Sequence, residues 1–171
     1  MKQLFGVWLD ICLLRAAPQD VPASGLLLAL SLAGYVSANF LLALASWRLE
    51  HALLATAADV LLLTAFTRLI LQWWRLPSRF AQTLSALTGS GALLALAALP
   101  SAAGIGHGQA ETAVTGVLTL VWLALLVWSV VVMGHVLRHA LSASFSTGVA
   151  LSLLYTVASI ALVGMLIPPS T

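Results

Sequence analysis

The sequence predicts an all-α integral membrane protein, with five transmembrane helices preceded by a short interfacial helix at the N-terminus. Of the 171 residues, 61% are hydrophobic and only 7% are charged. A soluble domain has about 25% charged residues, so this chain has too few polar side chains to cover a soluble surface. The apolar residues also fall into runs of roughly 20, the length at which a helix crosses the hydrocarbon core of a bilayer. We expect one membrane domain over residues 1–171.

The N-terminal stretch, about residues 3–15, is apolar but too short to cross a bilayer. On a helix, its polar or small residues share one side, and its large apolar residues crowd the other: Phe5, Trp8, Leu9 and Cys12. An amphipathic helix of this kind is expected to lie in the membrane interface, and an extra helix packed on the bundle is the alternative. Asp10, in the middle of the apolar run, argues against a cleaved signal peptide.

The five predicted transmembrane helices are separated by stretches rich in Pro, Gly or charged residues. They cover about residues 25–46, 52–73, 80–99, 113–136 and 145–167. Pro77 separates the second helix from the third, and Pro100 is expected to end the third. The stretch Ser101–Thr112 is expected to be a flexible connector, because its GIGHG lacks the strand and the Lys of a phosphate-binding loop.

The third predicted helix differs from the others because its first half is polar. Seven hydroxyl, amide or glycine residues occur from Gln82 to Gly91: Gln82, Thr83, Ser85, Thr88, Gly89, Ser90 and Gly91. Hydroxyls that face lipid lack partners unless they bond to their own helix. We therefore expect this helix to be buried among its neighbours.

Two of the predicted helices carry a small side chain at every fourth position, which lets another helix approach closely. The first helix has Gly25, Ala29, Ala33 and Ser37. The fifth has Ser144, Gly148 and Ser152, followed by Thr156. We expect these two faces to pack against each other, and a homodimer contact through the first helix is the alternative.

The basic residues predict the orientation. With a cytoplasmic N-terminus, one side of the membrane receives most of them: Lys2, Arg15, Arg75, Arg79 and Arg138. Only Arg48 lies in a loop on the other side, beside Glu50, His51, His107 and Glu111. Cytoplasmic loops carry the excess of Lys and Arg, so we expect a bacterial inner-membrane protein with its N-terminus cytoplasmic and its C-terminus periplasmic.

The cytoplasmic boundary is expected at a set of aromatic and basic anchors: Arg68, Trp73, Trp74, Arg75, Arg79 and Arg138. Arg68 lies within the apolar run of the second helix. Because it is close to the Trp pair, its long side chain can reach the interface.

Asp59 is the ionisable residue that topology does not explain. An acid in the apolar layer is costly, by roughly 2.5 to 3.5 kcal/mol on insertion scales. Matching depths across antiparallel helices puts four polar side chains near its level: Asn39, Ser159, Thr119 and Tyr155. The cluster could be a proton or cation site, or it could be a structural polar contact or a contact with a partner subunit.

Other chemistry is weakly indicated. Cys12 is the only cysteine, and no nucleophile has an adjacent base. His135 and His139 are one helical turn apart and could face a metal or haem edge, but their basic surroundings favour a lipid headgroup contact. The basic residues form no block of the kind that binds nucleic acid. We expect no enzyme activity and no cofactor.

A short N-terminal helix followed by five spans, with basic loops WWRLPSR and VLRHALSAS, resembles the Yip family of small five-span membrane proteins. The resemblance implies a non-catalytic partner of other membrane proteins. We therefore expect an accessory or scaffold subunit that packs against a larger membrane protein or complex, or that forms a homo-oligomer. The alternative is a small transporter or channel that uses Asp59.

Overall fold

The computed structural model describes residues 2–106 and 112–167, and over these residues the regular secondary structure is all helical, with short loops between the helices. Its long helices are α2 (Gly25–Leu44), α3 (Leu49–Trp73), α4 (Phe80–Gly106), α5 (Thr112–Leu141) and α6 (Phe145–Leu166). The short ones are α1 (Lys2–Cys12) and the 3-10 turns η1 (Pro18–Asp20) and η2 (Pro77–Arg79). The five long helices are long and apolar enough to cross a membrane, which confirms the predicted number of long apolar helices.

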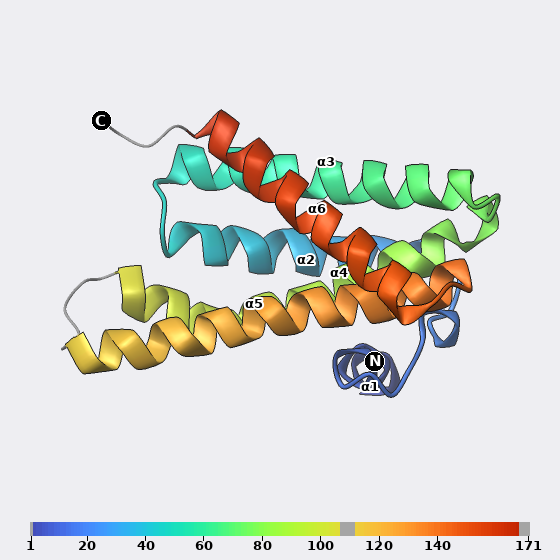
Figure 1. Ribbon diagram of the computed structural model, residues 1–171, viewed down its shortest axis with the longest axis horizontal. Coiled ribbons are helices and arrows are strands. Elements are labelled where there is room, and N and C mark those ends of the chain that lie inside the picture. Colours follow the sequence, from blue (N-terminus) through green and yellow to red (C-terminus); the bar gives the residue numbers. More distant parts are fainter. Residues whose placement is uncertain (1, 107–111, 168–171) are drawn as a thin grey trace.

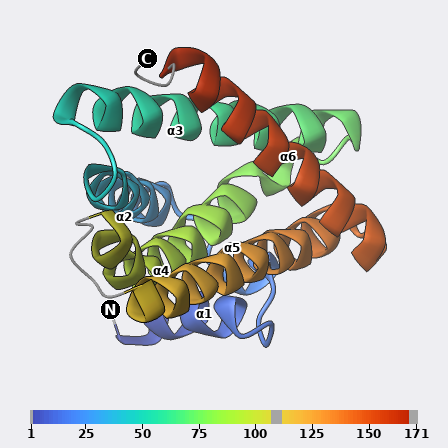
Figure 2. The ribbon, with the colours of Figure 1, turned by 60° about the vertical axis from the view of Figure 1, so that its left-hand side comes forward.

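The helices α2, α3, α4 and α5 run along the length of the molecule, and α6 crosses them obliquely (Figure 1). The central helix is α4, which packs against α2, α5 and α1 (Figure 2). Its polar first half is buried, as predicted: Ser85 and Thr88 are fully buried, and Thr83 and Ser90 nearly so. Thr88 Oγ1 donates to Leu84 O at 2.7 Å within its own helix, and Ser31 Oγ of α2 lies 2.9 Å from it. This hydroxyl pair links α4 to α2 through the core.

The short helix α1 lies across the bundle, seen end-on in Figure 1 where α5 is seen from the side. Trp8 packs where Gly89 of α4 has no side chain. The Cys12 thiol donates to Ser90 O at 3.5 Å, and Trp128 Nε1 of α5 donates to Cys12 O at 3.0 Å. Burial raises the pKa of this thiol to about 11. The helix is thus packed on the bundle, against α4 and α5.

The residues of α1 differ in how far they are covered by the bundle. Leu9 of the predicted apolar face is 51% exposed, whereas Ile11, which was not assigned to that face, is completely buried. Gly89 lies nine residues after Phe80, or ~14 Å along α4 at 1.5 Å per residue. The helix therefore contacts the bundle well below the ends of the long helices.

Three predicted boundaries are wrong. Pro100 does not end α4, which continues to Gly106, since a helix packed in a bundle tolerates one lost N–H. The fourth long helix includes Arg138 and His139, because nothing in the sequence breaks it before Ser142. The second begins at Leu49, inside the predicted turn. Of the predicted connector, His107 and Glu111 lie outside the described residues.

The two helices with small-residue faces do not use them alike. Gly25, Ala29, Ala33 and Ser37 are all exposed on α2. On α6, Gly148 and Ser152 are buried, and they pack on α5. The prediction that these two faces meet is wrong, because the buried side of α2 is instead the side with Leu27, Ser31 and Tyr35, which faces α4.

Candidate functional site

The Asp59 carboxyl lies where α2, α3 and α6 meet. Tyr35 of α2 donates its hydroxyl to Asp59 Oδ2 at 2.6 Å. Tyr155 and Ser159 of α6 donate to Asp59 Oδ1 at 2.7 and 3.0 Å. Both carboxyl oxygens are therefore hydrogen-bonded. Because hydroxyls can donate or accept, this arrangement provides partners for Asp59 with or without a proton.

Two of the four predicted partners, Tyr155 and Ser159, do contact Asp59. Asn39 instead donates its amide to Tyr35 O at 3.0 Å, one turn back along its own helix. Thr119 donates to Thr115 O at 2.8 Å, also within its own helix. Equal depth alone did not identify the partners, because it leaves the rotation of each helix undetermined.

Tyr35 is the contact that sequence reasoning missed. It is 8% exposed and sits one helical turn before Asn39, on the same face of α2. Searching one turn to either side of Asn39 would have found it. A buried tyrosine usually finds a hydrogen-bond partner for its hydroxyl, and that is the signal to use.

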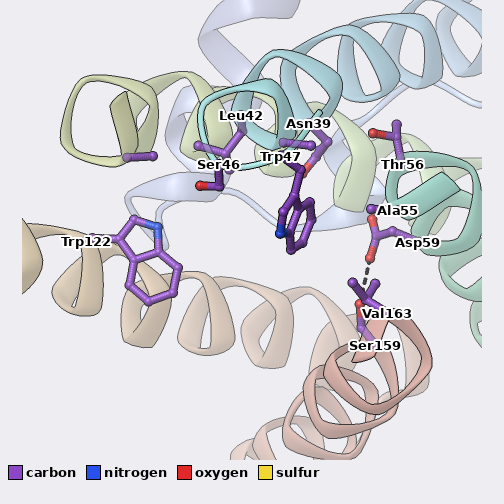
Figure 3. Close-up of a pocket in the computed structure, with 12 residues that line it drawn as sticks. Asn39, Leu42, Ser46, Trp47, Ala55, Thr56, Asp59, Trp122, Ser159 and Val163 are labelled. Atoms are coloured by element: carbon purple, nitrogen blue, oxygen red, sulfur yellow. Dashed lines mark hydrogen bonds between the residues drawn. The ribbon is translucent and has the colours of Figure 1, made fainter. Parts of the chain in front are cut away.

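A cavity of about 280 Å³ adjoins the carboxyl. Trp47 from the α2–α3 turn, Trp122 from α5 and Asp59 from α3 line it from three elements (Figure 3). Thr56 also lines it, and its buried Oγ1 has no hydrogen-bond partner among the described residues. The cavity is mostly apolar and has one acidic residue, and no basic residue appears among the described residues that line it.

The predicted anchor residues gather at one end of the bundle, at the end of α3, the start of α4 and the end of α5. Trp73 is 83% exposed and Trp74 is 38% exposed. Arg68 and Arg75 are also exposed. Arg75 has φ 58°, in the left-handed region, and the Leu76 N–H donates to Leu71 O at 2.8 Å to close the end of α3.

Arg79 joins the two basic turns. Its Nη1 donates to Ala140 O at 2.7 Å and to Ser142 Oγ at 3.1 Å, across from η2 to the end of α5. Arg138 has a different environment, because its guanidinium carbon lies 5.6 Å from the centre of the Phe145 ring. The basic residues of the two turns therefore lie at the same end of the molecule.

The histidine pair is engaged in local contacts. His135 Nε2 lies 3.0 Å from Ala16 O, and His139 Nε2 lies 3.0 Å from Arg138 Nη2. The two imidazole rings pack edge to face, with 4.7 Å between their centroids. No group of three or more His, Cys, Asp or Glu side chains that could hold a metal ion occurs in the described part of the chain.

Comparison of the chain with protein-family models, with curated proteins and with solved structures finds no match.

Proposed function

We propose that this protein is a non-enzymatic accessory or scaffold subunit, which packs against a transmembrane helix of a larger membrane protein. One observation carries the proposal: the small-residue face of α2 is exposed along its whole length, from Gly25 through Ala29 and Ala33 to Ser37. Between helices in lipid, close packing replaces the hydrophobic drive, and small residues at every fourth position permit it. The other helix with such a face, α6, uses it for internal packing.

Copurification tests the proposal. Protein solubilised in mild detergent should carry a larger membrane protein in fixed ratio, and Ala33→Leu should abolish that association by filling the α2 face. Ala57→Leu is the matched control, because Ala57 is also exposed but lies on α3. A strictly monomeric particle, or one that contains only copies of this chain, would contradict the proposal.

A second candidate, a small transporter or channel, is supported by the cavity beside Asp59. An acid that keeps hydrogen-bond partners in either protonation state suits a proton or cation site. Reconstituted vesicles should then show cation or proton flux that Asp59→Asn abolishes. Flux that persists in Asp59→Asn would remove Asp59 from this role, and no flux in the unaltered protein would remove the candidate.

The setting we propose is a bacterial inner membrane, with the N-terminus cytoplasmic and the C-terminus periplasmic. The supporting observation is that Arg75, Arg79 and Arg138 share one end of the bundle, since cytoplasmic loops carry the excess of basic residues. Membership of a Yip-like group stays a prediction. Cysteine accessibility at engineered positions in the α3–α4 and α2–α3 turns tests the orientation.

A further inference from the structure

A second cavity, of about 150 Å³, lies at the basic end of the bundle and is lined mainly by polar side chains. It forms where η1, the first turn of α4 and the last turn of α5 meet. Its polar lining comprises Gln19, Arg79, Gln82, Thr83, His139 and Ser142. It is far along the helices from Asp59, so it is a separate site.

The lining is rich in hydrogen-bond donors. Arg79 is oriented by the two bonds from Nη1, and a guanidinium carries five N–H donors in all. Thr83 is one of the residues that line the cavity, and it is 1% exposed; its buried Oγ1 has no partner among the described residues. A buried hydroxyl without a partner is costly, and a bound acceptor would remove that cost.

His139 is a further donor by the logic of its tautomer. Arginine only donates, so the contact of Arg138 Nη2 makes His139 Nε2 the acceptor. The ring proton of a neutral His139 then resides on Nδ1. The imidazole therefore retains one N–H donor of its own.

The charge at the cavity favours an anion. Arg79 is its charged lining residue, and no acidic side chain is found among the described residues that line it. Outside the lining, the Asp20 carboxyl acts electrostatically on His139. Its Oδ2 accepts the Ala17 N–H at 2.8 Å, so this carboxyl is occupied in holding η1.

We infer that this pocket binds the phosphoryl group of an anionic phospholipid headgroup. The pocket lies at the same end of the bundle as Trp73 and Trp74, which are at the end of α3. Tryptophans are enriched at the membrane interface, so the pocket is expected at the level of the lipid headgroups. Basic pockets between transmembrane helices are where anionic headgroups bind. The volume suits a phosphoryl group and its ester oxygens, with the acyl chains along the exposed apolar faces outside. This inference does not depend on the packing role of α2.

Native mass spectrometry of the full chain in detergent, titrated with dioleoyl phosphatidylglycerol or dioleoyl phosphatidylcholine, tests the inference. The unaltered protein should bind one phosphatidylglycerol at least tenfold more tightly than phosphatidylcholine. Thr83→Val removes one donor without changing the shape of the side chain, and it should weaken phosphatidylglycerol binding about tenfold. Asp20→Asn should tighten it, because it removes the nearby negative charge and keeps the oxygen that accepts from Ala17.

Thr67→Val is the matched control, because Thr67 is also 1% exposed with an unpartnered Oγ1 but lies on α3, outside the pocket. It should leave the affinity for phosphatidylglycerol unchanged. Equal affinity for the two lipids, or unchanged binding in Thr83→Val, would overturn the inference. Inorganic phosphate is titrated in the same way. If phosphate binds the protein, Thr83→Val weakens that binding, and phosphate does not displace phosphatidylglycerol, the pocket is a site for free phosphate and the headgroup assignment is wrong.

Discussion

The helices α2 and α6 carry the same sequence pattern and meet different surroundings. Each has a small side chain at every fourth position, but Gly148 and Ser152 of α6 are buried against α5, whereas the small residues of α2 are exposed. At Gly148, an added Cβ would overlap Gly134 O of α5, whereas nothing lies within 4 Å of Gly25 or Gly34. The pattern therefore indicates that another helix can pack closely on this face, and the fold decides whether that helix belongs to the same chain.

The largest expected effect is at the closest approach. Gly148→Leu should lower the free energy of unfolding by about 3 kcal/mol or more, because the obstructing atoms belong to backbone and cannot turn aside. Gly25→Leu should change it by less than about 0.5 kcal/mol. Denaturation in mixed detergent micelles measures both. Equal losses would show that the α2 face is also packed, and would break the comparison.

For the tyrosines that contact Asp59, the larger loss of stability is expected on α2 and the smaller on α6, the opposite of the order expected for the two glycines. Among the described residues, Asp59 Oδ2 accepts a hydrogen bond from the hydroxyl of Tyr35 alone. Asp59 Oδ1 accepts from both Tyr155 and Ser159, so it keeps the Ser159 bond when the Tyr155 hydroxyl is removed. Tyr35→Phe should therefore cost about 2 kcal/mol of unfolding free energy, and Tyr155→Phe about 1 kcal/mol. The same micelle denaturation measures them. A larger loss from Tyr155→Phe would mean that Oδ2 finds another donor.

A smaller difference is expected between two serines of the repeats. Ser152 is completely buried and donates to Val130 O of α5 at 3.0 Å, while Ser37 is exposed. Ser152→Ala should cost about 1 kcal/mol, in the range found for hydrogen bonds between transmembrane helices. Ser37→Ala should be close to neutral. A measurable cost at Ser37 in the isolated chain would contradict the assignment of an exposed face.

The smallest effect should be a gain. Gly34 lies in the interior of α2 with open space around it, so Gly34→Ala should stabilise the protein by about 0.5 to 1 kcal/mol through the helix preference for Ala. Gly134→Ala is the contrasting variant, because its Cβ would lie 3.1 Å from the Val149 backbone. It should not stabilise. A loss of stability in Gly34→Ala would mean that another part of the protein packs against Gly34, and would contradict the open space found there.

The Asp59 site was predictable in part. An acid in an apolar run signals a polar cluster, and Ser159 and Tyr155 were found by matching depth. Depth was insufficient for Asn39 and Thr119, since each helix can turn about its axis without any change in depth, and both side chains bond within their own helices. Tyr35 was missed because a tyrosine in a transmembrane helix is also typical of an apolar core position. The cavity, with Trp47 and Trp122 from distant parts of the chain, had no sequence signal.

By itself, the sequence determined the number of long apolar helices, the break between the second and third of them at Pro77, and the burial of the polar first half of α4. These follow from helix length, from backbone chemistry and from the cost of unpaired hydroxyls, all of which act locally. Only the tertiary structure decided which face of each helix is packed, where α1 lies, and that the exposed small-residue face belongs to α2. The physical reason is that packed and lipid-facing sides are both apolar, so hydrophobic periodicity carries little information about which helices meet.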